Sequence, residues 1–303
     1  MNNTLLFGNG LNLLSENPLS WDSLLQELEV GNNTISSGTP NTMKYEKIFL
    51  DRHSLKLNKS KDEELSIKEQ IAKLMEGQRG NSYYSEIIDL EFQNYLTTNY
   101  DNAFCETYGG EQSNESTEDI YSLRRYLTLN SKNHSGTKLW HIHGEVEHPK
   151  SIMLGLDHYC GSISKIDSYI KGNYEFKVKS TRKKVRPMVE KLTEKSFDQV
   201  SWVEMFFNSN VHILGLSLDY SETDLWWVLN KRARLMQSSN VSNKIYFYYS
   251  NILDSKKELL ESMGVTVINE FRNSNTNDDF QAAHNSLVKK LKSNIRELKS
   301  VTA

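Results

Sequence analysis

The sequence predicts an α/β protein with a doubly wound parallel sheet and an inserted or packed helical module. Short apolar runs recur along the 303 residues, and several of them stop at a glycine or at a pair of polar residues. Segments with apolar residues at helical spacing separate these runs, which is the pattern of strands alternating with helices. Such alternation favours a parallel sheet, and the chain is long enough for one large α/β domain with an added helical module.

The first apolar run covers residues 4–7 and stops at Gly8. Residues 21–28 then carry apolar side chains at helical spacing, so we expect a strand, a glycine loop and a helix. Residues 31–42 are turn-forming residues that cannot build a core. We expect a mobile surface loop there.

A helical segment is expected at about residues 43–90, where apolar residues at helical spacing alternate with many charges and a polar break occurs at residues 77–82. The runs Tyr95-Leu96-Thr97-Thr98 and Lys138-Leu139-Trp140-His141-Ile142-His143 then have the pattern of buried strands. We expect both runs to be strands, with a helix near residues 119–129 between them.

A second helical segment is expected at about residues 160–208. Its middle, residues 177–186, is strongly basic, and residues 188–207 have helix-like spacing. A run of like charges is usually a solvated face or loop. Contact with a partner or with a nucleotide phosphate is the alternative interpretation.

The last third of the chain repeats the pattern of strands and helices. Apolar runs at residues 211–215, 244–249 and 264–268 predict strands, a helix is expected around residues 224–229, and a C-terminal helix is expected at about residues 278–299. With the first half, these elements predict a single Rossmann-like domain over the whole chain. In such a fold, ligands bind beyond the carboxyl ends of the strands.

The composition excludes several classes of protein. The formal net charge of -3 gives no global electrostatic reason to expect nucleic acid or an anionic membrane as the main ligand, although local patches of charge are compatible with it. Because the start has no signal-peptide pattern and no apolar run approaches about 20 residues, we expect a cytoplasmic protein. The two cysteines, Cys105 and Cys160, can form neither a disulfide framework nor a four-cysteine zinc site. We therefore expect no metal.

The motif Gly8-Asn9-Gly10-Leu11-Asn12 follows the first predicted strand. Gly8 and Gly10 would let backbone N–H groups approach a pyrophosphate, and the amides of Asn9 and Asn12 can bond ribose or phosphate oxygens. The six-residue dinucleotide fingerprint is incomplete, because Leu13 stands where its third glycine would be. A tight strand-to-helix turn without a ligand is the alternative.

Polar side chains also follow the next two predicted strands. The amide of Asn99 can hold a water or a ribose hydroxyl, and the carboxylate of Asp101 can accept a carboxamide N–H, although Asx-turn capping explains both equally well. His143 precedes a glycine and is a candidate base, with a satisfied strand-end histidine as the alternative. If the strand continues through both histidines, His141 and His143 share one sheet face, and either is a candidate for the reacting group.

Taken together, these motifs resemble the SIR2 (sirtuin) family, most closely the SIR2-like NAD-hydrolysing domains of bacterial anti-phage defence proteins. Gly8-Asn9-Gly10-Leu11-Asn12 is similar to the family's Gly-Ala-Gly-hydrophobic-Ser loop, and Pro18-Leu19-Ser20-Trp21-Asp22-Ser23-Leu24-Leu25 is similar to a Pro-x-Trp-x-x-Leu-Leu stretch of the defence branch. Thr98-Asn99-Tyr100-Asp101 resembles the Asn-x-Asp motif, His143-Gly144 resembles the catalytic His-Gly, and Gly215-Leu216-Ser217-Leu218 resembles the Gly-x-Ser-hydrophobic step. The resemblance runs in order from about residue 3 to residue 270.

The chain departs from the family pattern in two ways. Asn9 and Asn12 replace the usual Ala and Ser of the first loop. The paired Cys-x-x-Cys zinc module of the deacylating sirtuins is absent, and a basic segment that we expect to be helical occupies the region after His143. The resemblance therefore implies hydrolysis of NAD itself rather than removal of acyl groups from lysine.

The resemblance also implies a role for each motif residue. Asn99 would position the ribose and a water, Asp101 would bind the nicotinamide end, and His143 would act as base or orient the ribose hydroxyls. The phosphates and the adenosine ribose would be held by the glycine loop and the second glycine step, that is by Gly8, Asn9, Gly10, Asn12, Gly215 and Ser217.

The resulting hypothesis is an NAD+ glycohydrolase that serves as the effector of an anti-phage abortive-infection system. We expect it to act as a homo-oligomer or in a complex with a separately encoded sensor or activator subunit, because uncontrolled loss of NAD+ would kill the host cell. A non-catalytic nucleotide-binding regulatory subunit is the alternative. An NAD-dependent protein deacylase is disfavoured by the missing cysteines.

Overall fold

The computed structural model of the chain describes residues 2–29, 38–55, 62–114, 120–121, 123–130, 135–178, 180–238, 241–272 and 276–302. Its centre is an eight-stranded sheet in the order β10-β9-β8-β1-β2-β5-β4-β3. Six neighbouring strands are parallel, and β4 and β3 add an antiparallel edge. The strands are β1 (Asn2–Phe7), β2 (Asn94–Thr97), β3 (Glu111–Asn114), β4 (Leu127–Asn130), β5 (Thr137–His141), β8 (Ser209–Leu214), β9 (Ile245–Ser250) and β10 (Val265–Glu270).

The sheet is doubly wound around β1. This strand pairs with β2 on one side and with β8 on the other. The chain first adds β2 and β5 on one side, and after β8 it continues outward through β9 and β10 on the other. The order of the strands therefore reverses between β1 and β8, and the crevice beyond their carboxyl ends is where folds of this kind bind ligands. This is the Rossmann-like α/β fold that the sequence predicts.

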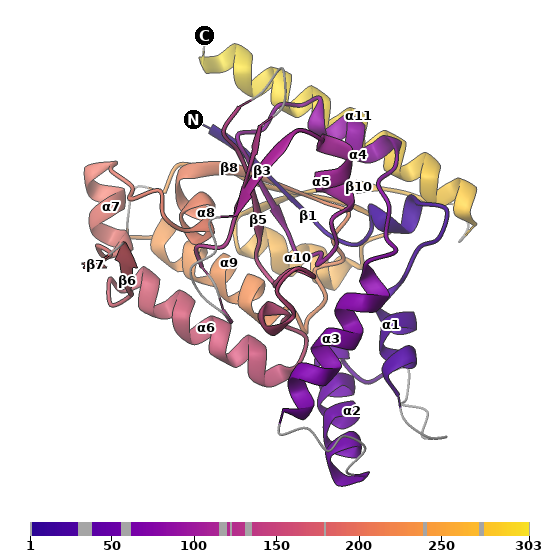
Figure 1. Cartoon of the computed structure of the whole chain (residues 1–303). Helices are drawn as coiled ribbons and strands as arrows, with labels where there is room; N and C mark the ends of the chain where they lie inside the picture. Colours follow the sequence, from indigo (N-terminus) through magenta and orange to yellow (C-terminus); the bar gives the residue numbers. More distant parts are fainter. Residues whose placement is uncertain are drawn as a thin grey trace.

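Helices cover both faces of the sheet, as Figure 1 shows. One face packs on α6 (Leu156–Ile170), α7 (Met188–Glu194), α8 (Met205–Asn208), α9 (Thr223–Met236) and α10 (Asp254–Ser262), and the other on α4 (Ser82–Ile88), α5 (Ala103–Tyr108) and α11 (Asn277–Thr302). The alternation of side chains along a strand divides the core accordingly. In β1, Leu6 belongs to the first face, whereas Leu5 and Phe7 belong to the second.

Three N-terminal helices form a separate group below the sheet in Figure 1. These are α1 (Trp21–Leu28), α2 (Asn41–Leu55) and α3 (Glu63–Met75). They share a small core with the segment after β5, since Leu24, Ile48 and Ile71 pack in one cluster with Val146 and Ile152. This helical group therefore contacts the loops at the carboxyl end of the sheet.

The expected helix near residues 119–129 is wrong. Asp119 lies outside the described residues, and the described residues 123–126 are not helical. Residues 127–130 form β4, which pairs with β5. Leu127 and Leu129 are buried while Thr128 and Asn130 are half-buried, and this two-residue period favours a strand.

The region at residues 160–208 is only partly helical. Its basic stretch forms a two-stranded hairpin of β6 (Glu175–Val178) and β7 (Thr181–Lys184), in which every side chain of β7 is exposed. The helix-like stretch that follows ends with α7 at Glu194, apart from a short 3-10 turn at Trp202–Glu204 and the four-residue helix α8. The buried carboxylate of Glu204 explains the break. It accepts hydrogen bonds from the backbone N–H groups of Asp198 and Gln199 and pairs with the buried Lys191 ammonium at 2.6 Å.

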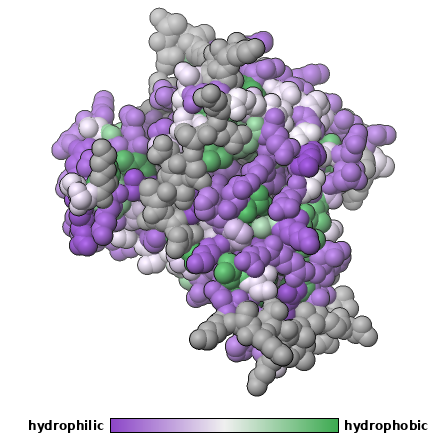
Figure 2. Space-filling model, in the orientation of Figure 1, coloured by the Kyte–Doolittle hydropathy of each residue, from purple (hydrophilic) through white to green (hydrophobic). Residues whose placement is uncertain are grey.

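Two further features concern surfaces. The expected mobile loop at residues 31–42 falls mostly outside the described residues, which resume at Gly38, and Asn41 already begins α2. Figure 2 shows that hydrophilic residues dominate the face drawn and that hydrophobic residues occur there in small groups. No helix in the described part of the chain is both long enough and apolar enough to span a lipid bilayer.

Candidate functional site

All residues predicted for the site lie beyond the carboxyl ends of four neighbouring strands. The motif from Gly8 to Asn12 follows β1, Asn99 and Asp101 follow β2, His143 follows β5, and Gly215 and Ser217 follow β8. Because these strands are parallel and adjacent, the four loops meet at one edge of the sheet. The structure therefore gathers residues that the sequence separates by more than two hundred positions.

The two glycine loops pack directly on each other between β1 and β8. The Gly10 N–H donates to the Gly215 carbonyl oxygen at 2.7 Å. A Cβ on Gly10 would lie 2.6 Å from that same oxygen, and Gly215 has a φ of 64°, which favours glycine. The absence of side chains at these positions is thus required for the loops to approach, whether or not a ligand is bound.

A pocket of about 290 Å³ opens beside these loops. Four of the predicted residues line it, namely Asn9, Gly10, Gly215 and Ser217. Aromatic side chains from three other elements complete the wall: Trp21 of α1, Tyr248 and Tyr249 of β9, and Phe280 and His284 of α11. A pocket with a polar glycine end and an aromatic wall can accept a phosphate-bearing nucleotide.

Asn12 is the centre of a buried hydrogen-bond network that joins the loops after β1 and β2. Its side-chain amide donates to Asn9 Oδ1 at 3.0 Å and to Asp101 Oδ2 at 2.8 Å. Its own oxygen accepts from the Tyr84 hydroxyl at 2.5 Å, and the Asn99 side chain in turn donates to that hydroxyl at 3.3 Å. One asparagine therefore fixes both motif loops.

The two polar residues after β2 have different surroundings. Asp101 is buried, and its Oδ1 accepts from the Ala103 N–H at 3.0 Å, so an Asx turn just before α5 is present together with the bond to Asn12. Burial raises the pKa of Asp101, although these hydrogen bonds oppose the shift. The Oδ1 atom of Asn99 is also buried, and among the described residues it has no hydrogen-bond partner. A buried acceptor left unsatisfied is costly, so this atom is suited to a ligand hydroxyl or a water.

The two candidate histidines do not share surroundings. β5 ends at His141, whose Nδ1 donates to the Asn99 carbonyl oxygen at 3.1 Å. His143 lies in the turn beyond the strand, where Gly144 has a φ of 102°. The condition for a shared sheet face is therefore not met, and the His143 ring is directed instead toward Asp224 of α9 at 3.2 Å.

His143 is enclosed by acidic and hydroxyl groups. The Tyr159 hydroxyl of α6 lies 3.5 Å from its Nδ1, and the buried Glu222 carboxyl lies in its electrostatic surroundings. Burial lowers the pKa of His143, but the Asp224 carboxylate and then Glu222 raise it, so that it lies above its usual value. Burial raises the pKa of Glu222 to about 7, against the opposing effect of His143. The set can thus hold and exchange protons near neutral pH.

Sequence reasoning missed five residues of this site: Tyr84, Tyr159, Ser162, Glu222 and Asp224. The three from α4 and α6 belong to helices whose apolar spacing marks them only as core. The two acidic residues gave a usable signal. Glu222 and Asp224 stand two positions apart at the start of a helix that follows the Gly215 step, where a functional loop is expected.

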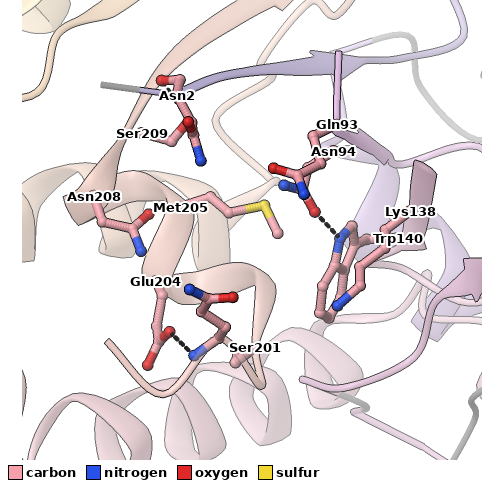
Figure 3. A pocket seen from close by; sticks show the side chains of 11 residues that line it. Asn2, Gln93, Asn94, Lys138, Trp140, Ser201, Glu204, Met205, Asn208 and Ser209 are labelled. Carbon is pink, nitrogen blue, oxygen red and sulfur yellow. Dashed lines mark hydrogen bonds between the residues drawn. The ribbon is translucent and has the colours of Figure 1, made fainter. Parts of the chain in front are cut away.

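A second pocket, of about 220 Å³, lies at the opposite end of the sheet. Figure 3 shows its side chains, which include Asn2, Asn94, Trp140 and Glu204. Trp140 Nε1 donates to Asn94 Oδ1 at 3.1 Å, so part of the polar lining is already satisfied. The predicted motifs contribute nothing to this pocket, so the candidate site remains the one at the carboxyl edge.

The part of the chain that the structure describes contains no group of three or more histidine, cysteine, aspartate or glutamate side chains that could hold a metal ion. Cys105 is a buried free thiol and Cys160 an exposed one.

Comparison with known families agrees with this arrangement. A family model described as a SIR2-like domain matches residues 93–268, more than half of the chain. The match includes the loops after β2, β5 and β8, while the glycine loop after β1 precedes it. None of the curated proteins matches the chain. The chain belongs to the SIR2-like family, whose domains are typically NAD-dependent enzymes.

Proposed function

We propose that this protein is an NAD+ glycohydrolase, which uses water to cleave the bond between nicotinamide and ribose and releases nicotinamide and ADP-ribose. The observation that carries the proposal is the buried Asn99 amide beyond the carboxyl end of β2. Its nitrogen is held by Tyr84, and its oxygen has no partner among the described residues. An oriented, unsatisfied amide oxygen is suited to fix a ribose hydroxyl or the attacking water.

The pocket beside the glycine loops supports a place for the adenosine diphosphate half. Gly10 and Gly215 expose backbone there, and Asn9 and Ser217 add polar side chains. The aromatic wall at the other end suits a flat base. The nicotinamide half would then extend toward the loops after β2 and β5, where Asn99, Asp101 and His143 lie.

The chemistry asked of the site is limited. The nicotinamide ring of NAD+ is cationic, so nicotinamide leaves as a neutral molecule. The site therefore lowers the activation barrier mainly by holding the ribose, stabilising an oxocarbenium-like transition state and positioning a water. Asp101 would accept the carboxamide N–H, which its remaining lone pairs allow because a carboxylate has about four acceptor positions. His143 would act as base or orient the ribose hydroxyls.

We further propose that the enzyme is the effector of an anti-phage system and is activated by a separate subunit or by oligomerisation. The resemblance of its motifs to defence-branch domains supports the antiviral role. Burial supports the regulation, because Asn99 is 3% exposed and His143 is 2% exposed. A site enclosed to this degree has to open before a dinucleotide reaches it.

The test is a direct assay for nicotinamide and ADP-ribose after incubation of the purified protein, with and without its genomic neighbour, with NAD+. His143→Ala and Asn99→Ala should each abolish cleavage while retaining the far-ultraviolet circular dichroism of the wild type. Release of nicotinamide only in the presence of an acylated peptide would identify a deacylase. Binding of NAD+ without any cleavage under all these conditions would identify a regulatory nucleotide-binding subunit.

A further inference from the structure

The shorter of the two hydrogen-bond contacts of the His143 ring is with a residue from the other half of the fold. Asp224 stands in the first turn of α9, has no exposed surface, and places its Oδ2 atom 3.2 Å from His143 Nε2. The two residues are separated by 81 positions in the sequence. Their contact therefore depends on the pairing of β8 beside β1 and on the packing of α9 against α6.

Asp224 is itself held in place. The Ser162 hydroxyl of α6 donates to the same Oδ2 atom at 3.2 Å, and the Leu225 N–H donates to Oδ1 at 2.8 Å. Ser162 is also buried, at 2% exposure. A carboxylate fixed on both oxygens inside the protein offers its neighbour a single orientation.

The two nitrogens of the His143 ring have unlike partners. An ionised carboxylate only accepts hydrogen bonds, so the nitrogen that faces Asp224 carries the proton. On the other side of the ring, the Tyr159 hydroxyl lies 3.5 Å from Nδ1, at the limit of a hydrogen bond. The two rings meet edge to face, with centroids 5.2 Å apart. A contact this weak leaves Nδ1 free to accept a stronger bond from a substrate hydroxyl.

We propose that Asp224 is the positioning residue for His143: it holds the ring proton on Nε2 and leaves Nδ1 as the basic nitrogen that faces the substrate. This inference rests on the proposed function, because it assumes that His143 takes part in cleavage. The arrangement follows the logic by which a buried aspartate fixes the tautomer of a catalytic histidine in other hydrolases.

Glu222 has a separate role in the same group. It lies two residues before Asp224, it is 9% exposed, and its Oε2 atom has no hydrogen-bond partner among the described residues. Its charge acts on His143 without a direct hydrogen bond. The groups that face the His143 ring are thus Asp224 of α9, Glu222 of the preceding turn, and Tyr159 of α6. Glu222 should affect the protonation of the ring but not its tautomer.

The first measurement does not depend on activity. The tautomer of His143 is read from long-range nitrogen–proton correlation spectra of the full chain labelled with nitrogen-15 histidine, at a pH where the ring is neutral. His143→Asn identifies the signal among the eight histidines. The wild type and Glu222→Gln should show the proton on Nε2, whereas Asp224→Asn should show a mixture or the Nδ1-protonated form.

The second measurement is kinetic. Asp224→Asn should lower kcat for NAD+ cleavage by about 10²- to 10⁴-fold with little change in KM, a range set by the loss seen when such an aspartate is replaced in other hydrolases. Removing the negative charge also lowers the pKa of His143, so the acidic limb of the profile of kcat/KM against pH should move to lower pH. Asp224→Glu should recover part of the lost kcat.

Glu204→Gln is the matched control. Like Asp224→Asn, it replaces a buried carboxylate by an amide, but near the opposite end of the sheet, where Glu204 pairs with Lys191. It should lower the melting temperature but leave the tautomer and the pH profile unchanged. An Nε2-protonated ring in Asp224→Asn, or a wild-type kcat in that variant, overturns the inference. If the wild type cleaves no NAD+ either alone or with its genomic neighbour, but the tautomer changes as stated, the proposed function fails and the positioning role stands.

Discussion

The amide of Asn12 donates to Asp101 Oδ2 at 2.8 Å and so ties the loop after β1 to the loop after β2. The two residues are 89 positions apart, and both are buried. The bond also has an electrostatic consequence. Burial raises the pKa of Asp101, and the hydrogen bond from Asn12 opposes that shift, so Asn12 helps the buried carboxylate to remain ionised.

Asn12→Ala is therefore expected to destabilise the fold more at neutral pH than at acidic pH. The change leaves Asp101 Oδ2 and the Tyr84 hydroxyl without this partner, which costs about 1–3 kcal/mol of unfolding free energy for a buried unsatisfied group. At acidic pH the carboxyl is protonated and the penalty falls. Urea unfolding at the two pH values measures the difference, and Asn230→Ala on α9 is a control that should change stability by less than about 0.5 kcal/mol. Equal losses at both pH values would show that the charge of Asp101 does not matter.

The packed glycine loops give a second prediction. Gly10→Ala would place a Cβ 2.6 Å from the Gly215 carbonyl oxygen, which is backbone and cannot move aside. We expect a loss of about 1–3 kcal/mol, the usual cost of overpacking, together with weaker NAD+ binding because the pocket loops separate. Gly77→Ala is the matched control, since nothing lies within 4 Å of the added Cβ there. Thermal unfolding and isothermal titration with NAD+ compare the two variants, and similar values for both would contradict the prediction.

How much of this site can be predicted from the sequence depends on how far apart the contacting residues are along the chain. The glycine loop, the Asn99 and Asp101 pair, and His143 each follow a local apolar run, so their places at strand ends can be predicted from a few neighbouring residues. The bonds from Asn12 to Asp101 and from His143 to Asp224 join residues 89 and 81 positions apart. Periodicity carries no information about such pairs.

The errors in the fold have the same origin. Helical spacing in residues 188–207 is real, but the helix stops because Glu204 binds the backbone N–H groups of Asp198 and Gln199 and pairs with Lys191. A tertiary contact thus overrides local propensity. At β4 the sequence offers only a short alternation of Leu127 and Leu129, and the strand is fixed by its pairing with β5.

Because the native state keeps a proton on Glu222, the free energy of unfolding should fall as the pH rises from about 4.5 to about 7. Burial raises the folded-state pKa of this carboxyl from 4.5 to about 7, so between these values the native state keeps a proton that the unfolded chain has lost. His143 acts in the same direction, because its raised pKa adds stability below its usual value of 6.5 that is lost at higher pH. The Glu222 contribution is about 3 kcal/mol at most, at 1.36 kcal/mol per pKa unit.

Glu222→Gln removes the first contribution, so its curve of unfolding free energy against pH should be flatter than that of the wild type between pH 4.5 and about 7. Urea unfolding over a pH series measures both curves. Glu258→Gln, at an exposed position on α10, should leave the slope unchanged. Parallel curves for wild type and Glu222→Gln would mean that Glu222 is ionised in the native state throughout this range.

The last prediction concerns control of the proposed activity. The isolated chain should be nearly inactive and tolerated by cells, because Asn99 and His143 are only 3% and 2% exposed and Tyr159 packs edge to face against the His143 ring. Access to these groups requires their cover to move, and α6, which carries Tyr159, is part of that cover. Contact with a partner subunit or with further copies of the chain can supply the free energy for this movement.

The decisive measurement is NAD+ hydrolysis by the isolated chain over a concentration series, with light scattering to report the oligomeric state, and again after addition of the protein encoded by the neighbouring gene. Turnover per chain should rise with assembly or with the added protein. His143→Ala should assemble in the same way but remain inactive, which separates assembly from catalysis. Full turnover by a monomer, independent of concentration, would contradict the prediction, because the enclosed site would then open without help.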